Sequence, residues 1–141
     1  MADVSLLQIE EILYPTLEVR TNGSYNPQGE QGGTLVKFGR KVEKVQGRPG
    51  KYGLIVSMAS DNEKSRNATY SFVIDAYALV SLGGAPIEGE EATMTFLMQN
   101  GMPLVMGALR ERLADVTARM PYGRFLINAV PLPQALQINQ M

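Results

Sequence analysis

The sequence predicts an α+β domain in which a four-stranded antiparallel sheet packs with one short and one long C-terminal helix. Apolar residues alternate with other residues through positions 34–82, which is the pattern of half-buried strands. Glycine, proline and polar turns separate these segments, so strands that follow each other in the chain are expected to pair as a meander. Apolar residues then recur every three or four positions over 105–120, as in an amphipathic helix. Strands first and helices last are typical of a two-layer α+β domain.

The clearest strand is predicted over residues 67–82. One face carries an apolar residue at every second position, namely Tyr70, Phe72, Ile74, Ala76, Ala78, Val80 and Leu82. The other face mixes polar and apolar side chains, namely Ser71, Val73, Asp75, Tyr77, Leu79 and Ser81. Because this second face is only partly polar, we expect both sides of the strand to be covered.

Two further strands are predicted before it, over residues 51–60 and 34–45. The apolar face of the first consists of Tyr52, Leu54, Val56 and Met58. The second places Val36, Phe38 and Val42 on one face and Lys37, Lys41 and Glu43 on the other. The polar residues 61–66 and the Gly- and Pro-containing residues 47–50 supply the turns of this three-stranded meander.

The N-terminal segment allows two interpretations. In the first, Leu6, Ile9 and Leu13 are spaced as on one face of a helix, and Asp3 before them is a candidate N-cap. Its alternating residues are Leu7, Ile9, Ile12 and Tyr14, with one slip such as a bulged strand would show. The local pattern slightly favours the helix. Residues 21–33 hold four glycines and one proline and are predicted to form a loop that crosses over another element.

Two helices are predicted after the sheet. Residues 90–99 form the short one, with acidic residues in its first turn that suit the helix dipole. The long helix begins near Pro103, which suits a first turn, and ends before Pro121. Its apolar stripe consists of Val105, Leu109, Leu113, Val116 and Met120.

Composition excludes several classes of function. The 141 residues are predicted to form a single domain, 1–141, and a net charge of −1 gives no reason to expect nucleic-acid binding. With no Cys and no His, the chain lacks disulfides, thiolate metal sites and the commonest general base, so we expect no metal site, and Ser-His-Asp hydrolysis and most acid–base enzymes are excluded. Glu88, Glu90 and Glu91 could act as a carboxylate pair in glycoside hydrolysis, but acids at a helix start are more often dipole partners.

The chain also lacks sequence signals for a membrane. No apolar run reaches the roughly 18–20 residues of a membrane span, so no membrane insertion is expected. The first residues lack the basic flank and apolar core of a signal peptide. We therefore expect a cytoplasmic protein.

The order of segments resembles SecB, the bacterial protein-export chaperone family, and its SecB-like relatives. Residues 7–14, LQIEEILY, are similar to an opening strand that precedes a crossover loop in that family. Residues 70–82, followed by the acidic link 86–89, resemble the strand that leads into paired helices. The most distinctive match is the apolar segment 125–136, FLINAVPLPQAL, after the long helix. The resemblance spans nearly the whole chain.

The resemblance implies an ATP-independent chaperone that holds unfolded polypeptides, such as export-bound preproteins, in apolar surface grooves. It implies a homotetramer built as a dimer of dimers, without cofactor or enzyme activity, and it implies a strand at the N-terminus. Typical members pass clients to SecA, are strongly acidic, and carry a Cys- and His-bearing tail that contacts the zinc module of SecA. This chain is nearly neutral and has neither residue type, which puts SecA in doubt as a partner. In some relatives the client is the antitoxin of a toxin–antitoxin pair.

Candidate site residues follow from exposed apolar chemistry and from the resemblance. Candidate client-binding residues are Tyr25, Val36, Phe38, Val42, Met106, Met120, Phe125, Leu126 and Leu132. Candidate residues of an oligomer interface are Tyr70, Phe72, Ile74, Met94 and Met98. For each of these the alternative is burial in the core of its own chain, or, for residues 125–132, a clasp on the C-terminus. The competing function is a phage or plasmid structural or assembly subunit whose apolar tail docks on a neighbour.

Overall fold

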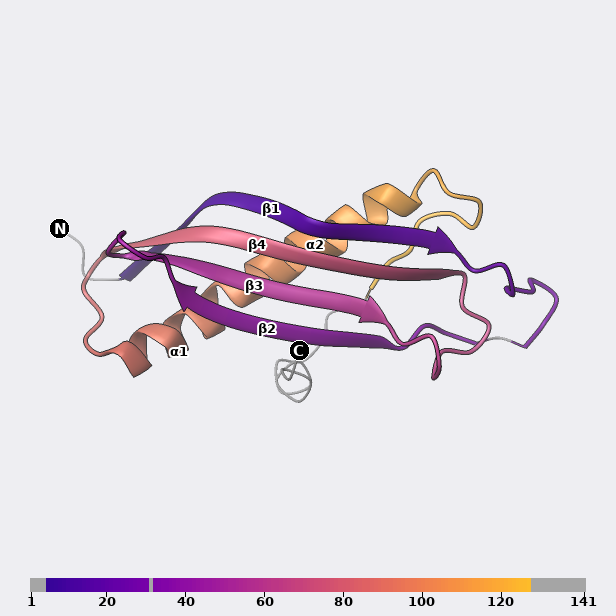
Figure 1. Cartoon of the computed structure of the whole chain (residues 1–141), viewed down its shortest axis with the longest axis horizontal. Helices are drawn as coiled ribbons and strands as arrows, with labels where there is room; N and C mark the ends of the chain where they lie inside the picture. The colour runs from indigo at the N-terminus through magenta and orange to yellow at the C-terminus, as the bar shows by residue number, and fades with distance from the viewer. Residues whose placement is uncertain (1–4, 31, 128–141) are drawn as a thin grey trace.

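The computed structural model describes residues 5–30 and 32–127, which form one sheet with two helices on one side (Figure 1). In chain order the elements are β1 Ser5–Thr21, β2 Val36–Lys44, β3 Lys51–Ser60, β4 Tyr70–Gly84, α1 Glu90–Asn100 and α2 Met102–Thr117. The predicted fold class, a four-stranded antiparallel sheet with one short and one long C-terminal helix, is confirmed.

The strands are ordered β1-β4-β3-β2, and every neighbouring pair is antiparallel. The meander β2–β3–β4 is the predicted one, and β3 has the predicted bounds. β1 lies at one edge of the sheet and β2 at the other. The described part of residues 22–35, which we call the crossover loop, therefore joins the two edges of the sheet, as the loop predicted over residues 21–33 was expected to do.

The N-terminal segment is a strand, so the helix favoured by its local pattern is wrong. β1 pairs along almost the whole of β4, and its register shifts between Ile9 and Glu11 and again between Leu13 and Thr16. The first shift is a bulge that turns Ile12 to the same side as Ile9. The alternating residues of the strand interpretation, Leu7, Ile9, Ile12 and Tyr14, all pack against the core.

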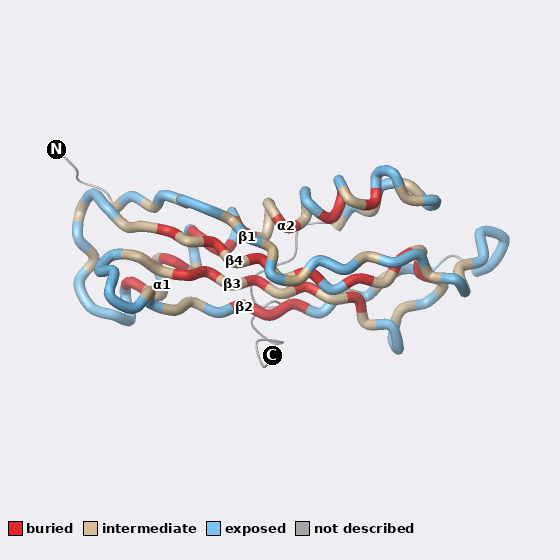
Figure 2. The backbone as a smooth tube through the Cα atoms, turned by 45° about the horizontal axis from the view of Figure 1, so that its top comes forward, coloured by how far each residue is buried: buried red, intermediate tan, exposed pale blue. Residues whose placement is uncertain are grey.

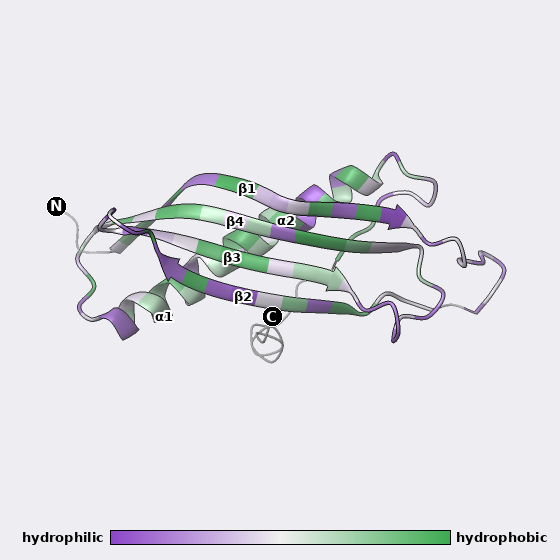
Figure 3. Ribbon diagram, in the orientation of Figure 1, coloured by the Kyte–Doolittle hydropathy of each residue, from purple (hydrophilic) through white to green (hydrophobic). Residues whose placement is uncertain are grey.

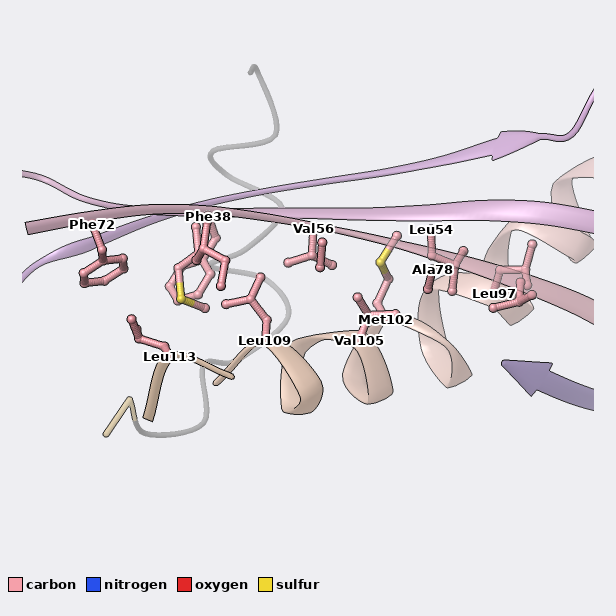
Figure 4. Close-up of a cluster of buried hydrophobic side chains, with 14 residues drawn as sticks. Phe38, Leu54, Val56, Phe72, Ala78, Leu97, Met102, Val105, Leu109 and Leu113 are labelled. Atoms are coloured by element: carbon pink, nitrogen blue, oxygen red, sulfur yellow. The ribbon is translucent and has the colours of Figure 1, made fainter. Parts of the chain in front are cut away.

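Both helices cover the same side of the sheet, which we call the inner face, and the core lies between them and β3 and β4 (Figures 1 and 4). Val105, Leu109 and Leu113 of α2 are all 0% exposed, opposite Leu54, Val56 and Ile74 of the sheet. Complete burial of such a side chain contributes about 1.5–3 kcal/mol. The burial of these residues therefore fixes α2 on the sheet.

The long helix is shorter than the sequence predicted. α2 ends at Thr117, and the last two positions of the expected stripe, Val116 and Met120, are only half-buried. Ala114 and Thr117 take the buried positions instead. The backbone N–H of Ala118 already bonds to two carbonyls, those of Ala114 and Asp115, so the last turn tightens before Pro121 is reached.

Gly101 joins the two helices at a point of close approach. A β-carbon on this residue would lie 2.5 Å from Leu54 Cδ1 and 2.8 Å from the carbonyl oxygen of Leu97. The backbone N–H of Gly101 donates to that carbonyl at 2.8 Å. Absence of a side chain here therefore lets α1 continue into α2 while both stay against the sheet.

The opposite side of the sheet, which we call the outer face, carries no helix (Figures 1 and 2). In β4, Val73 is 42% exposed and Tyr77 and Leu79 are half-buried. No described element of this one chain covers the outer side of β4, so the expected covering of both sides is not seen within a single chain. Figure 3 shows that apolar residues predominate along much of β4. Neither helix of the described part is long and apolar enough to cross a membrane.

Candidate functional site

A hollow of about 440 Å³ lies where the crossover loop meets the start of β4, and we call it the crossover hollow. Its wall comes from three parts of the chain, namely the crossover loop, the residues just before β4 and the segment after α2. The lining residues are Tyr25, Pro27, Gly29, Glu30, Gly32, Gly33, Thr34, Asn67, Ala68, Thr69 and Phe125. The hollow thus combines two aromatic side chains with a glycine-rich rim.

A larger hollow of about 670 Å³ surrounds the turn between β2 and β3. It is lined only by residues of this hairpin, from Lys44 to Tyr52. Two of its cations are already paired, Lys44 with Glu90 at 3.1 Å and Lys51 with Glu10. A space beside a single turn, with its lysines engaged elsewhere, is a weaker candidate for a binding site.

Asn67 holds the crossover loop in place. Its side-chain oxygen accepts a hydrogen bond from the N–H of Asn26 at 2.9 Å. Its side-chain nitrogen donates to the carbonyls of Asn26 at 3.0 Å and Glu30 at 2.7 Å. Asn67 is also the one described non-glycine residue with a positive φ, 46°, a conformation that asparagine tolerates better than most residues. The shape of the hollow therefore depends on this side chain.

A series of aromatic contacts connects the crossover loop to the start of β4. The rings of Tyr25 and Tyr122 lie edge to face with centroids 4.7 Å apart, and Tyr122 lies 5.9 Å from Tyr70. Phe125 contacts Tyr70 at 6.2 Å and Phe72 at 5.5 Å. These distances lie within the range of favourable aromatic pairs. Two residues of the set, Tyr70 and Phe72, are fixed in the core and two, Tyr25 and Phe125, reach the hollow.

Hydroxyl groups hold the segment after α2, residues 122–127, which we call the clasp. The Tyr70 hydroxyl donates to the carbonyl of Gly123 at 2.7 Å and accepts from the N–H of Tyr122 at 3.0 Å. The buried hydroxyl of Thr117 accepts from the N–H of Phe125 at 2.7 Å and bonds to the carbonyl of Leu113 at 2.8 Å. The hydrogen bond from the backbone N–H of Phe125 to Thr117 thus holds Phe125 beside the hollow.

The structure brings together two of the nine candidate client-binding residues. Tyr25 and Phe125 both line the crossover hollow and are both half-buried. Phe38 is only 5% exposed and belongs to the core. Leu126, which follows Phe125 in the sequence, is 70% exposed. The half-buried candidates that pack elsewhere are Val36, Val42 and Met106 against the core and Met120 beyond α2. Leu132 lies outside the described residues. A client-binding role for any of them stays a prediction.

The candidate interface residues of β4 point inward. Tyr70, Phe72 and Ile74 are 2%, 3% and 0% exposed within a single chain. Side chains covered to this extent have little surface left for a second subunit, which favours the alternative of core packing. Met94 and Met98 of α1 are half-buried, and their role at an interface stays a prediction.

Sequence reasoning missed three residues that build the site, namely Asn67, Thr117 and Tyr122. No periodic pattern marks them, because each acts through a contact with a distant segment. It also missed Arg40, although Phe38 and Val42 on either side predict that Arg40 faces inward. Arg40 is 7% exposed, and its burial lowers the pKa of the guanidinium, which still stays protonated near neutral pH.

Comparison with known proteins supports the fold. No family model and no curated protein matches the chain. The structure is similar to a SecB-like chaperone of Mycobacterium tuberculosis, solved in complex with a ChAD peptide from the HigA1 antitoxin. That match has a TM-score of 0.66 at 14% identity and covers 88% of this chain and 90% of the other. A protein of unknown function from Streptococcus agalactiae matches with a TM-score of 0.46 at 10% identity, over 89% and 99% of the two chains. The fold of this chain is therefore SecB-like.

Proposed function

We propose that this protein is an ATP-independent chaperone that holds unfolded polypeptide, with the crossover hollow as a binding site. The observation that carries the proposal is the position of Tyr25 and Phe125, two half-buried rings that face one hollow from two distant parts of the chain. Half-buried aromatic rings offer large contact areas at little conformational cost, which suits binding to apolar side chains of many sequences. The glycine-rich rim leaves backbone accessible to an extended client.

The comparison favours one kind of client. The M. tuberculosis protein with this fold was solved with an antitoxin peptide bound. We propose, by this likeness, that an unfolded antitoxin segment is the first client to test for the present chain. An export-bound preprotein is the second. We further propose that the protein acts in the cytoplasm, as a homo-oligomer and without enzyme activity.

The test is binding of the purified protein to a reduced, permanently denatured polypeptide, followed by fluorescence anisotropy. We expect binding to the denatured polypeptide, no binding to the same polypeptide when folded, and no change on adding ATP. Absence of binding to the denatured form would contradict the chaperone function and favour an assembly subunit.

A variant then tests the position of the site. Tyr25→Ser removes one ring from the hollow, and we expect about tenfold weaker binding because aromatic residues often dominate such contacts. Tyr52→Ser is the matched control, since Tyr52 is also half-buried but lies near the β2–β3 turn, away from the crossover hollow. Equal effects of the two substitutions would mean that clients bind elsewhere.

A further inference from the structure

Two asparagines in the chain are followed directly by glycine. They are Asn22 before Gly23 and Asn100 before Gly101. In such a pair the backbone nitrogen of the glycine can attack Cγ of the asparagine side chain. A bond forms between these two atoms, the Cγ–Nδ2 bond breaks, and Nδ2 leaves as ammonia with the proton of the glycine N–H. Water then opens the cyclic imide to aspartate or isoaspartate. Glycine permits the attack because it has no side chain to obstruct it.

The fold leaves Gly23 open to this reaction. The N–H of Tyr25 donates to the Asn22 carbonyl at 3.0 Å, so residues 22–25 form a turn with Gly23 in its second position. Such a turn is closed by the N–H of its fourth residue alone. No described residue accepts a hydrogen bond from the Gly23 N–H, and a β-carbon on Gly23 would have nothing within 4 Å. Figure 2 shows the loop that follows β1 as mostly exposed.

The Asn22 side chain is held beside that nitrogen. Its Oδ1 accepts a hydrogen bond from the Ser24 N–H at 3.0 Å, which closes a ring that includes the Gly23 nitrogen. As the Gly23 nitrogen attacks Cγ, negative charge develops on Oδ1, where the Ser24 N–H already donates. A donor aimed at developing charge lowers the barrier of an attack on a carbonyl. The turn therefore supplies both a nucleophile and a donor for the oxyanion.

The second pair is protected by its helix. The Gly101 N–H donates to the Leu97 carbonyl at 2.8 Å, and Gly101 is buried. The Asn100 side chain donates to the Phe96 carbonyl at 2.9 Å, one turn back along α1. The Gly101 N–H is thus directed along the helix, and its hydrogen bond must break before the nitrogen can attack. Asn100 therefore serves as an internal control for Asn22.

Asn22 also ties the crossover loop to the segment before β4. Its Nδ2 donates to the Ala68 carbonyl at 2.7 Å, and its N–H donates to the Thr69 carbonyl at 2.8 Å. Ala68, Thr69 and Tyr25 all line the crossover hollow. Deamidation replaces Nδ2 by an oxygen, which cannot donate and, when ionised, repels the Ala68 carbonyl. In the isoaspartate product the carbonyl that closes the turn also leaves the main chain, so the position of Tyr25 changes as well.

We propose that Asn22 is a site of spontaneous deamidation in the folded protein, through attack by the Gly23 nitrogen, and that the product releases the crossover loop from Ala68. The reaction consumes only water and adds one negative charge to a chain of net charge −1. Because Ala68 is part of the wall of the crossover hollow, this hollow changes as the molecule ages. The inference does not depend on chaperone function, since it rests on the contacts of the turn and not on a client.

The experiment is incubation of the full chain at physiological temperature and mildly alkaline pH, followed by peptide mass spectrometry. In the folded protein we expect Asn22 to convert about tenfold faster than Asn100, the factor that one broken hydrogen bond represents. In urea the two should convert at similar rates. Gly23→Ala is the matched control, because its methyl group obstructs the attack but meets no atom within 4 Å, so Asn22 should stay intact. The proposal is overturned if folded wild type converts Asn22 no faster than Asn100, or if Gly23→Ala converts as fast as wild type.

A second measurement tests the release of the loop. Asn22→Asp supplies the aspartate product directly, and we expect protection against amide hydrogen exchange over residues 22–26 to fall about tenfold. Asn26→Asp is its control, because it adds the same charge to the same loop. The Asn26 side chain accepts a hydrogen bond from the Gln28 N–H at 3.0 Å, which a carboxylate does equally well, so protection should stay at the wild-type level. Wild-type protection in Asn22→Asp, or an equal loss in Asn26→Asp, would overturn the release of the loop.

Discussion

The rings of Tyr25 and Tyr122 meet edge to face, with their centroids 4.7 Å apart, and this contact joins the crossover loop to the clasp. Tyr122 in turn contacts Tyr70, which is 2% exposed and belongs to β4. A loop rich in glycine is thereby connected to β4, which lies between β1 and β3 in the sheet, through two aromatic contacts. Substitution of Tyr70, the buried residue of this series, should therefore alter the position of Tyr25 at the crossover hollow.

The first prediction concerns the Tyr70 hydroxyl. Tyr70→Phe leaves the ring in place but removes the partner of both the Gly123 carbonyl and the Tyr122 N–H. Partly buried backbone groups that lose their partners cost about 1–3 kcal/mol in the free energy of unfolding. Urea denaturation followed by circular dichroism measures this loss.

Tyr14→Phe is the control for this prediction. The Tyr14 hydroxyl reaches the Ala108 carbonyl only at 3.4 Å, a marginal hydrogen bond, so its removal should cost less than about 0.5 kcal/mol. If the two variants were equally stable, the clasp would not depend on Tyr70.

The second prediction concerns Thr117, whose hydroxyl is the anchor for Phe125. Thr117→Val keeps the shape of the side chain but leaves the Phe125 N–H without its 2.7 Å acceptor. We expect a loss of about 1–3 kcal/mol in stability and weaker client binding, because Phe125 lines the hollow. Thr117→Ser retains the hydroxyl and should keep client affinity. Loss of affinity in the serine variant as well would assign the effect to packing rather than to the hydrogen bond.

The sequence predicts the regular part of this fold because each pattern there repeats along a continuous segment. β3 alternates without interruption between two clear turns, and both of its bounds are predicted. β1 is different because it contains a bulge at Glu10. In a regular strand, successive inward residues are two positions apart, but here the inward residues Ile9 and Ile12 are three positions apart. That spacing also fits a helix. The local pattern therefore cannot distinguish a helix from a bulged strand, and pairing with β4 makes this segment a strand.

The candidate site is less predictable than the fold, for a physical reason. Phe38 and Phe125 are both aromatic residues in apolar segments, yet the first is in the core and the second lines a hollow. The difference depends on which segments meet at the end of the sheet, and contacts such as that between Tyr25 and Tyr122 join residues far apart in sequence. Asn67 acts through its backbone conformation, which no composition pattern reveals.

The third prediction compares two glycines of the helical region. Gly107 lies within α2 and has open space where a β-carbon would be, so Gly107→Ala should stabilise the protein by about 0.5–1 kcal/mol through helix propensity alone. Gly101→Ala would place its methyl group 2.5 Å from Leu54 Cδ1 and 2.8 Å from the Leu97 carbonyl. Such overpacking costs about 1–3 kcal/mol. Thermal unfolding of the two variants should therefore shift in opposite directions, and a stabilising Gly101→Ala would contradict the close approach of the helices to the sheet.

The last prediction concerns pH and the pair of Glu10 and Lys51, which joins the bulge of β1 to the start of β3. The Lys51 ammonium donates a hydrogen bond to the Glu10 carboxylate, and Ser81 contributes another, so the pKa of Glu10 lies below its ordinary value of 4.5. A lowered pKa in the folded state means that the charged carboxylate favours folding. This stabilisation is complete above the ordinary value and is lost as the pH falls through the lowered pKa.

Wild-type protein should therefore be more stable than Glu10→Gln at pH 7, and the difference should shrink as the pH falls below 4.5. Denaturant unfolding of both proteins between pH 7 and pH 3 measures this change. Glu63→Gln removes a carboxylate from the exposed turn between β3 and β4 and serves as the control. If the stability of Glu10→Gln ran parallel to that of wild type across the whole range, the ion pair would contribute nothing that depends on charge, and the bulge would be held by its backbone pairing with β4 alone.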